Sequence, residues 1–159
     1  MSVLIAYATR YGTTKRVAEQ VAAEVRGATA AEIGRNGAPD PGRSDLVVIG
    51  GPVYAGKIVS VVPKYCEANR EALSRGPVAL FISCLYKEEQ AKQQLEAAFP
   101  PWLLSRAFGK YTVGGAVHMD RLSFFHRMIM KGVMKTSEDI DAIDEAGIRK
   151  MISEIQARV

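Results

Sequence analysis

The sequence has few groups that bind metals and no long apolar run. Its 159 residues include two histidines and two cysteines, Cys66 and Cys84, and these form neither a C-x-x-C pair nor a Cys/His cluster, which argues against a metal site. No stretch approaches about 18 uninterrupted apolar residues, and the start lacks the pattern of a signal peptide. We therefore expect one cytoplasmic domain over residues 1–159, large enough to fold around its own core.

The net charge is also small, at +4, but it is unevenly distributed. Between Trp102 and Lys135 there are six basic residues and one acidic residue, whereas from Thr136 to the end three basic residues accompany six acidic ones. A local excess of basic residues is typical of a surface that faces an anion. We expect a small anionic substrate here, and no nucleic acid.

The first residues predict a strand, a tight turn and a helix. Ser2–Ala8 is an apolar run rich in β-branched and aromatic residues, as in a strand buried on both faces of a parallel sheet. Apolar residues then recur on one helical face, namely Val17, Val21 and Val25. The free amides and positive dipole end of this helix, together with threonine hydroxyls, would bind a phosphate.

Residues 9–14 (TRYGTT) form the turn, and two interpretations of them are open. Threonines before a helix commonly only cap its backbone. The glycine patterns of dinucleotide folds and of nucleoside triphosphatases are absent. The turn instead resembles the phosphate loop of flavodoxins, which wraps the phosphate of FMN with hydroxyls and amides. The resemblance implies that FMN contacts Thr9, Arg10, Tyr11, Gly12, Thr13 and Thr14, with Arg10 as an outward or substrate-side charge.

Strands alternate with helices along the rest of the chain, which predicts a parallel sheet with helices on both faces. We expect strands at 2–8, 28–33, 46–49, 77–83 and 111–117, with a turn-rich segment at 34–43 and helices near 58–69, 88–99 and 138–157. This order matches the α/β doubly wound, flavodoxin-like sheet 2-1-3-4-5, in which the ligand binds outside the carboxyl ends of the first and third strands.

Two further loops open at that edge of the sheet. After the third strand, Gly50 and Gly51 would allow close approach of a ligand, and Tyr54 offers a ring for stacking, although an ordinary glycine-rich turn is the alternative. Flavodoxins hold the isoalloxazine between the equivalent loops. The resemblance therefore implies FMN contacts from Pro52, Val53, Tyr54, Ala55, Gly56, Ser83, Cys84, Leu85 and Tyr86. Lys57 and Lys87 leave these loops as candidate catalytic residues that favour reduction of the flavin.

An additional helix is expected at about 118–137, between the fifth strand and the last helix. Its apolar stripe consists of Leu122, Phe125, Ile129 and Val133. Arg127, Lys131 and Lys135 are spaced by four on another face, and together with Arg121 they form a basic patch. It is either a packed surface helix with solvated basic side chains or a lid that contacts an anionic substrate or membrane surface. We expect His118 and His126 to be surface residues, with proton shuttling as the alternative.

Taken with residues 9–14, the segments Val48-Ile49-Gly50, Gly115-Ala116 and Phe125-x-x-Met128-Ile129-x-Lys131-x-x-Met134-Lys135 resemble the flavodoxin-type, menaquinone-dependent protoporphyrinogen oxidase family. The resemblance implies an FMN-dependent oxidoreductase of heme biosynthesis that oxidises protoporphyrinogen IX and passes electrons to a quinone, with peripheral contact to the inner face of the membrane. Two alternatives stay open: an electron carrier that docks on a redox partner protein, and an FMN-dependent quinone reductase. The sequence leaves the oligomeric state open.

Overall fold

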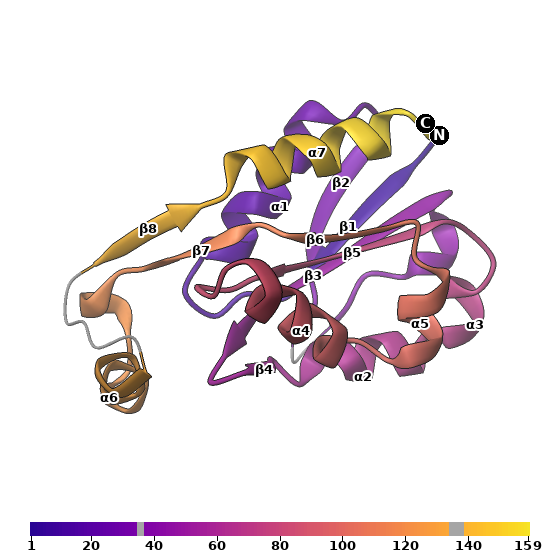
Figure 1. The fold of residues 1–159 in the computed structure, drawn as a ribbon. Helices are drawn as coiled ribbons and strands as arrows, with labels where there is room; N and C mark the ends of the chain where they lie inside the picture. Colours follow the sequence, from indigo (N-terminus) through magenta and orange to yellow (C-terminus); the bar gives the residue numbers. More distant parts are fainter. Residues whose placement is uncertain (35–36, 134–138) are drawn as a thin grey trace.

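A five-stranded parallel sheet organises the chain. The computed structural model describes residues 1–34, 37–133 and 139–159. The sheet has the order β2-β1-β3-β5-β6, which confirms the expected topology (Figure 1). Its strands are β1 (Val3–Tyr7), β2 (Ala28–Glu32), β3 (Leu46–Tyr54), β5 (Val78–Ser83) and β6 (Gly109–Thr112). Every residue of β1 and of β5 is buried, as continuous apolar runs predict for central parallel strands.

Helices cover both faces of the sheet (Figure 1). One face packs against α1 (Thr13–Glu24) and α7 (Glu145–Gln156), with Val17, Val21 and Ile148 in the shared core. The other face packs against the remaining helices beside the sheet: α2 (Val61–Ala68), α3 (Arg70–Leu73), α4 (Glu88–Ala98) and α5 (Pro101–Arg106). Helix α5 was not expected between the helix predicted near 88–99 and the strand predicted at 111–117; it begins at Pro101, and proline suits the first turn of a helix.

The third strand is longer than expected and its glycines have another purpose. β3 continues to Tyr54 and turns back through Ala55 and Gly56 into the antiparallel β4 (Lys57–Ile58). A Cβ at Gly50 would lie 2.1 Å from the ring of Phe81 on β5. A Cβ at Gly51 would lie 2.8 Å from Val62. These glycines therefore make room for core side chains, which corrects the expectation that they allow close approach of a ligand.

The predicted fifth strand is split, and part of the predicted last helix is a strand. β6 ends at Thr112, and β7 (Gly114–Val117) pairs antiparallel with β8 (Ile140–Ile143). Gly114 has φ +72, a left-handed conformation that only glycine adopts readily, so the chain leaves the sheet there. Helix α7 begins after Asp144, whose carboxylate accepts a hydrogen bond from the Gly147 amide at 3.0 Å. Ile140 and Ile143 fit the helical period of the predicted last helix, but residues 140–143 form a strand because they pair with β7.

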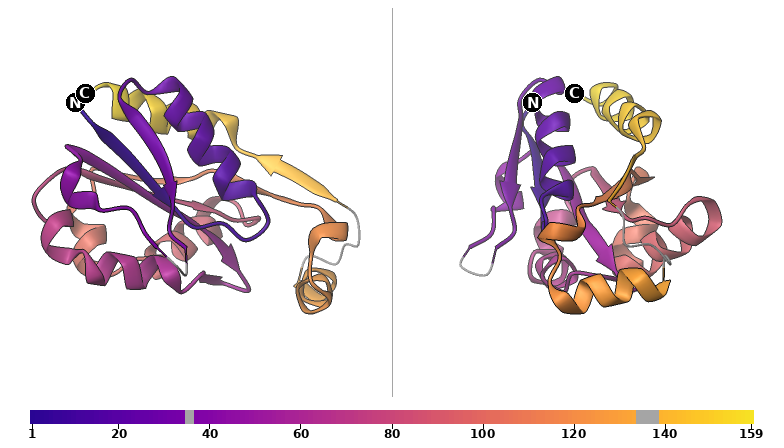
Figure 2. Two further views of the ribbon diagram at one scale, coloured as in Figure 1. Left: turned by 180° about the vertical axis from the view of Figure 1, so that it is seen from behind. Right: turned by 90° about the vertical axis from the view of Figure 1, so that its left-hand side faces the viewer.

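The segment from β7 to β8 is called the extension below. It contains a short 3-10 turn (Met119–Arg121) and α6 (Phe124–Val133), which confirms the expected additional helix. The two views in Figure 2 and the view in Figure 1 show α6 at the end of the extension, remote from both termini. No helix among the described residues has the length and apolar character needed to cross a membrane.

Candidate functional site

The loop between β1 and α1 presents free backbone donors. Gly12 occupies the N-cap position with φ +96, and its amide donates to Thr9 Oγ1 at 3.0 Å. Within the described residues, the amides of Thr13, Thr14 and Lys15 donate no hydrogen bond. Three adjacent N–H groups at the positive end of a helix dipole form a binding site for an anion.

The hydroxyls around these amides already have partners within the protein. Thr14 is fully buried, and its Oγ1 lies 2.8 Å from Ser83 Oγ at the end of β5. Thr13 Oγ1 donates to the carbonyl of Ala116 in the extension at 3.3 Å. The amides are therefore the principal donors, and the Thr14–Ser83 pair fixes the start of α1 against the end of β5.

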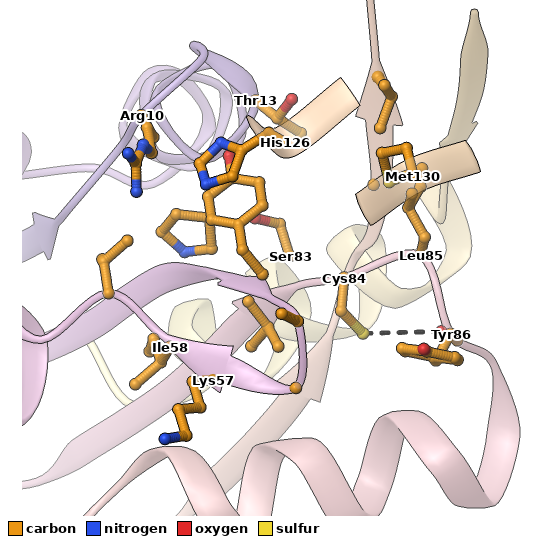
Figure 3. A pocket seen from close by; sticks show the side chains of 18 of the residues that line it. Arg10, Thr13, Lys57, Ile58, Ser83, Cys84, Leu85, Tyr86, His126 and Met130 are labelled. Carbon is orange, nitrogen blue, oxygen red and sulfur yellow. Dashed lines mark hydrogen bonds between the residues drawn. The ribbon is translucent and has the colours of Figure 1, made fainter. Parts of the chain in front are cut away.

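A cavity of about 290 Å³ lies beside this loop (Figure 3). Its size is at the lower end of the range for small-molecule sites. The structure brings most of the predicted site residues to its wall, namely Arg10, Thr13, residues 52–57 and residues 83–86. Thr9, Tyr11, Gly12 and Thr14 belong to the loop but not to the wall, and Lys87 is an exposed residue outside it.

The extension supplies a wall that the sequence interpretation did not include. Its contribution consists of residues 115–117, Leu122, His126 and Met130. Ile58 at the end of β4 and the following Val59 also line the cavity. His126 and Met130 are four residues apart on α6 and share one face of that helix, whereas Leu122 precedes the helix. The predicted apolar stripe included Leu122 but neither His126 nor Met130, and their spacing was the signal that could have identified these two.

Arg10 and Lys57 are the cations that line the cavity. Among the described wall residues there is no carboxylate. Arg127, predicted for an anion-facing patch, uses its guanidinium within the extension, where Nε and Nη2 donate to the Met119 carbonyl at 3.2 and 2.9 Å. Lys131 is exposed, whereas Lys135 and the side chain of Arg121 lie outside what the structure describes.

Three aromatic rings from three parts of the chain meet at the cavity. The His126 ring stacks on Tyr54, with centroids 5.2 Å apart and 14° between the planes. Tyr11 meets both rings edge-on, and its hydroxyl is hydrogen-bonded to His126 Nδ1. His126 is only 8% exposed, which corrects the expectation of a surface residue. His118 is a surface residue as expected, with its side chain 40% exposed.

Burial sets the protonation of these groups. It lowers the pKa of His126 below the usual 6.5, and the positive charge of Arg10 lowers it further, so the ring is neutral at neutral pH. Burial raises the pKa of the Tyr54 phenol above 10.0 and that of the Cys84 thiol above 9.0. Cys84 is therefore a thiol, and its Sγ lies 3.6 Å from the Tyr86 carbonyl.

The residues present fit a ligand with a phosphate and a flat ring. The amides at the start of α1 match the phosphate, and the neighbouring cavity has apolar and aromatic walls for the ring. Among the described residues, no group of His, Cys, Asp and Glu side chains is arranged to hold a metal ion. The arrangement suits chemistry supplied by a bound organic cofactor.

Comparisons with known proteins agree with this geometry. A family model described as "Flavodoxin domain" matches residues 4–143. No sequence among the curated proteins matches the chain significantly.

Among solved structures, a flavodoxin, WrbA-like protein from Agrobacterium tumefaciens has a TM-score of 0.59 at 15% identity, over 99% of this chain and 98% of that one. A flavoprotein from Lactobacillus acidophilus in complex with FMN has a TM-score of 0.50 at 19% identity, over 72% and 91%. Flavodoxin from Megasphaera elsdenii has a TM-score of 0.51 at 16% identity, over 69% and 84%. At these identities the likeness concerns the fold.

Proposed function

Because this chain belongs to the flavodoxin domain family, we propose that it is an FMN-dependent oxidoreductase that oxidises protoporphyrinogen IX and passes the electrons to a quinone. FMN is the cofactor of this flavodoxin-like protein. One observation carries the choice of an enzyme: the cavity at the sheet edge has a second wall, from the extension, and this wall brings His126 and apolar side chains to the site.

The protein holds FMN through two sets of groups. The amides of Thr13, Thr14 and Lys15 bind the phosphate, since they are free and lie at the positive end of α1. The hairpin at residues 52–57 and the loop at residues 83–86 hold the isoalloxazine. FMN supplies the electron chemistry, because a bound flavin accepts two electrons from a substrate and returns them to an acceptor.

The chemistry of the cavity favours a substrate with both apolar and anionic parts. Arg10 and Lys57 line it without any described carboxylate, while Leu122 and Met130 make the extension side apolar. A porphyrinogen has apolar pyrrole rings, which suit the apolar wall, and anionic propionates, which suit Arg10 and Lys57. Met128 is 57% exposed and Lys131 is exposed on α6, which supports peripheral contact with an anionic membrane that holds the quinone.

The test mixes purified holoprotein with protoporphyrinogen IX and a menaquinone analogue without oxygen, and follows porphyrin fluorescence. We expect many turnovers. Arg10→Gln with Lys57→Gln should raise KM about tenfold, whereas Lys92→Gln on exposed α4 should have no effect, because Lys92 lies outside the cavity. If no porphyrin forms but the protein exchanges electrons normally with a redox protein, it is an electron carrier. If it reduces the quinone with electrons from NADPH, it is a quinone reductase.

A further inference from the structure

His126 differs from the other titratable groups in the cavity wall. The described wall contains the cations Arg10 and Lys57, the phenols Tyr54 and Tyr86, the thiol Cys84 and this imidazole. Of these side chains, only histidine ordinarily exchanges a proton near neutral pH. Burial raises the pKa of Cys84 and of Tyr54, so these two groups keep their protons at neutral pH. A proton that leaves a substrate in this cavity therefore has one suitable acceptor in the wall.

The position of the imidazole is fixed from several sides. Tyr11, in the loop that precedes α1, binds Nδ1 through its hydroxyl, and the ring of Tyr54 stacks on the imidazole. The same Tyr11 hydroxyl accepts from the Ser123 amide at 3.4 Å, and Ser123 Oγ accepts from the His126 amide at 3.3 Å. A residue from the extension is thus tied to the loop that would hold the FMN phosphate.

The charges around His126 keep it ready to accept a proton. Arg10 and Tyr11 face it from the loop, Tyr54 faces it from the end of β3, and Arg127 follows it on α6 with its guanidinium on the Met119 carbonyl. The neutral form is favoured until negative charge develops nearby or a substrate releases a proton.

We propose that His126 is the proton-transfer residue of this site and that Tyr11 positions it, an inference that rests on the proposed function. Each two-electron step of porphyrinogen oxidation removes two electrons and two protons, and three such steps convert the porphyrinogen into a porphyrin. FMN, held by residues 52–57 and 83–86, would supply the acceptor for the hydrogen that leaves a carbon of the substrate as hydride. The second hydrogen leaves as a proton: an N–H bond of the substrate breaks and an N–H bond forms at Nε2 of His126, which requires the neutral tautomer whose Nδ1–H donates to the Tyr11 hydroxyl. His126 then gives this proton to the quinone, whose reduction consumes two electrons and two protons.

The first test compares the pH dependence of kcat for holoproteins with His126→Gln, Tyr11→Phe and His118→Gln. His126→Gln should lower kcat by a factor of about 10² to 10⁴ with little change in KM, and the acidic limb of the pH profile should disappear. Tyr11→Phe keeps the ring but frees Nδ1, so it should lower kcat about tenfold and shift the acidic limb. His118→Gln is the matched control, because His118 lies outside the cavity wall and near Asp139, and it should leave kcat unchanged.

Rescue separates proton transfer from a structural role. Free imidazole should restore kcat of His126→Ala, with an efficiency that follows the pKa of substituted imidazoles. FMN content and thermal unfolding identify a variant that has lost its fold. If the His126 variants do not fold, the pH profile of kcat for Tyr11→Phe tests the proposal instead. An unchanged pH profile in folded His126→Gln, or the absence of rescue in folded His126→Ala, would overturn the proposal.

A second readout needs no substrate. Photoreduction of the holoprotein in weak buffer, followed with a pH indicator, measures the protons taken up by the protein and FMN together. Negative charge on reduced FMN favours protonated His126, so the wild type should take up more protons near neutral pH than His126→Gln does. Equal uptake would contradict the role of His126 even if porphyrinogen is turned over. Larger uptake without any porphyrinogen turnover would instead contradict the proposed substrate and leave His126 as the proton acceptor.

Discussion

The parallel sheet and the extension build the same site with different kinds of contact. In the sheet, residues such as Ile5, Ile49 and Leu80 are 0% exposed and every central strand has two neighbours. The extension has its own two-stranded ladder and a small cluster in which Val117, Met119 and Leu122 are each 7% exposed. The sheet therefore fixes one wall of the cavity through many buried contacts, whereas a smaller set of contacts holds the wall that the extension supplies.

The largest expected effect is a methyl group added to the sheet. Gly50→Ala would place Cβ 2.1 Å from the buried ring of Phe81, which has no room to move. Overpacking of this kind should lower the free energy of unfolding by about 3 kcal/mol. Urea denaturation followed by circular dichroism measures it.

The matched change in the extension is Gly132→Ala on α6, where a Cβ would meet nothing within 4 Å. Since alanine favours helix over glycine, it should stabilise α6 locally by up to about 1 kcal/mol and leave global unfolding unchanged. Equal losses from the two substitutions would mean that the sheet and the extension unfold as one unit.

The second prediction concerns the point where the extension leaves the sheet. Gly114→Ala would strain a residue with φ +72 and place Cβ 2.1 Å from the Ala142 carbonyl oxygen. We expect a loss of about 2 kcal/mol that is confined to the pairing of β7 with β8. Hydrogen exchange should accelerate at the amides of these two strands and stay slow in β1. Faster exchange throughout β1 would contradict the separation of the two regions.

The same difference explains what the sequence could predict. The sheet order and the loop before α1 follow from local signals: apolar runs, turn residues and a helical period that starts at Thr13. The extension depends on contacts between distant residues, such as Tyr11 with His126. The segment at 140–143 is a strand because β7 is beside it, and no local pattern shows this. Gly50 was misinterpreted for a similar reason, since its partner Phe81 lies on another strand.

The third prediction tests the contact that joins β5 to α1 inside the sheet region. Thr14→Ala or Ser83→Ala would leave one buried hydroxyl without its partner at 2.8 Å, at a cost of about 1 to 2 kcal/mol in unfolding free energy. The double variant should cost less than the sum, because the second change removes the orphaned group. FMN affinity, measured by fluorescence quenching, should fall in each single variant as the start of α1 loosens. Strict additivity would show that the two hydroxyls act independently.

The smallest expected effect distinguishes the two regions by pH. The pKa of His126 is lowered from 6.5 by burial and by Arg10, so an extension detached from the site binds a proton more readily than the docked one. The free energy that holds the extension against the site should therefore be constant above neutral pH and become less favourable as the pH falls below 6.5. The stability of the sheet should show no such dependence. Hydrogen exchange at about pH 5.5 and about pH 7.5, corrected for intrinsic rates, measures this in β7 and β8.

His126→Gln should remove the difference, because glutamine does not titrate in this range. Persistence of the difference in His126→Gln would assign it to another group and would show that His126 does not link the extension to the solvent pH.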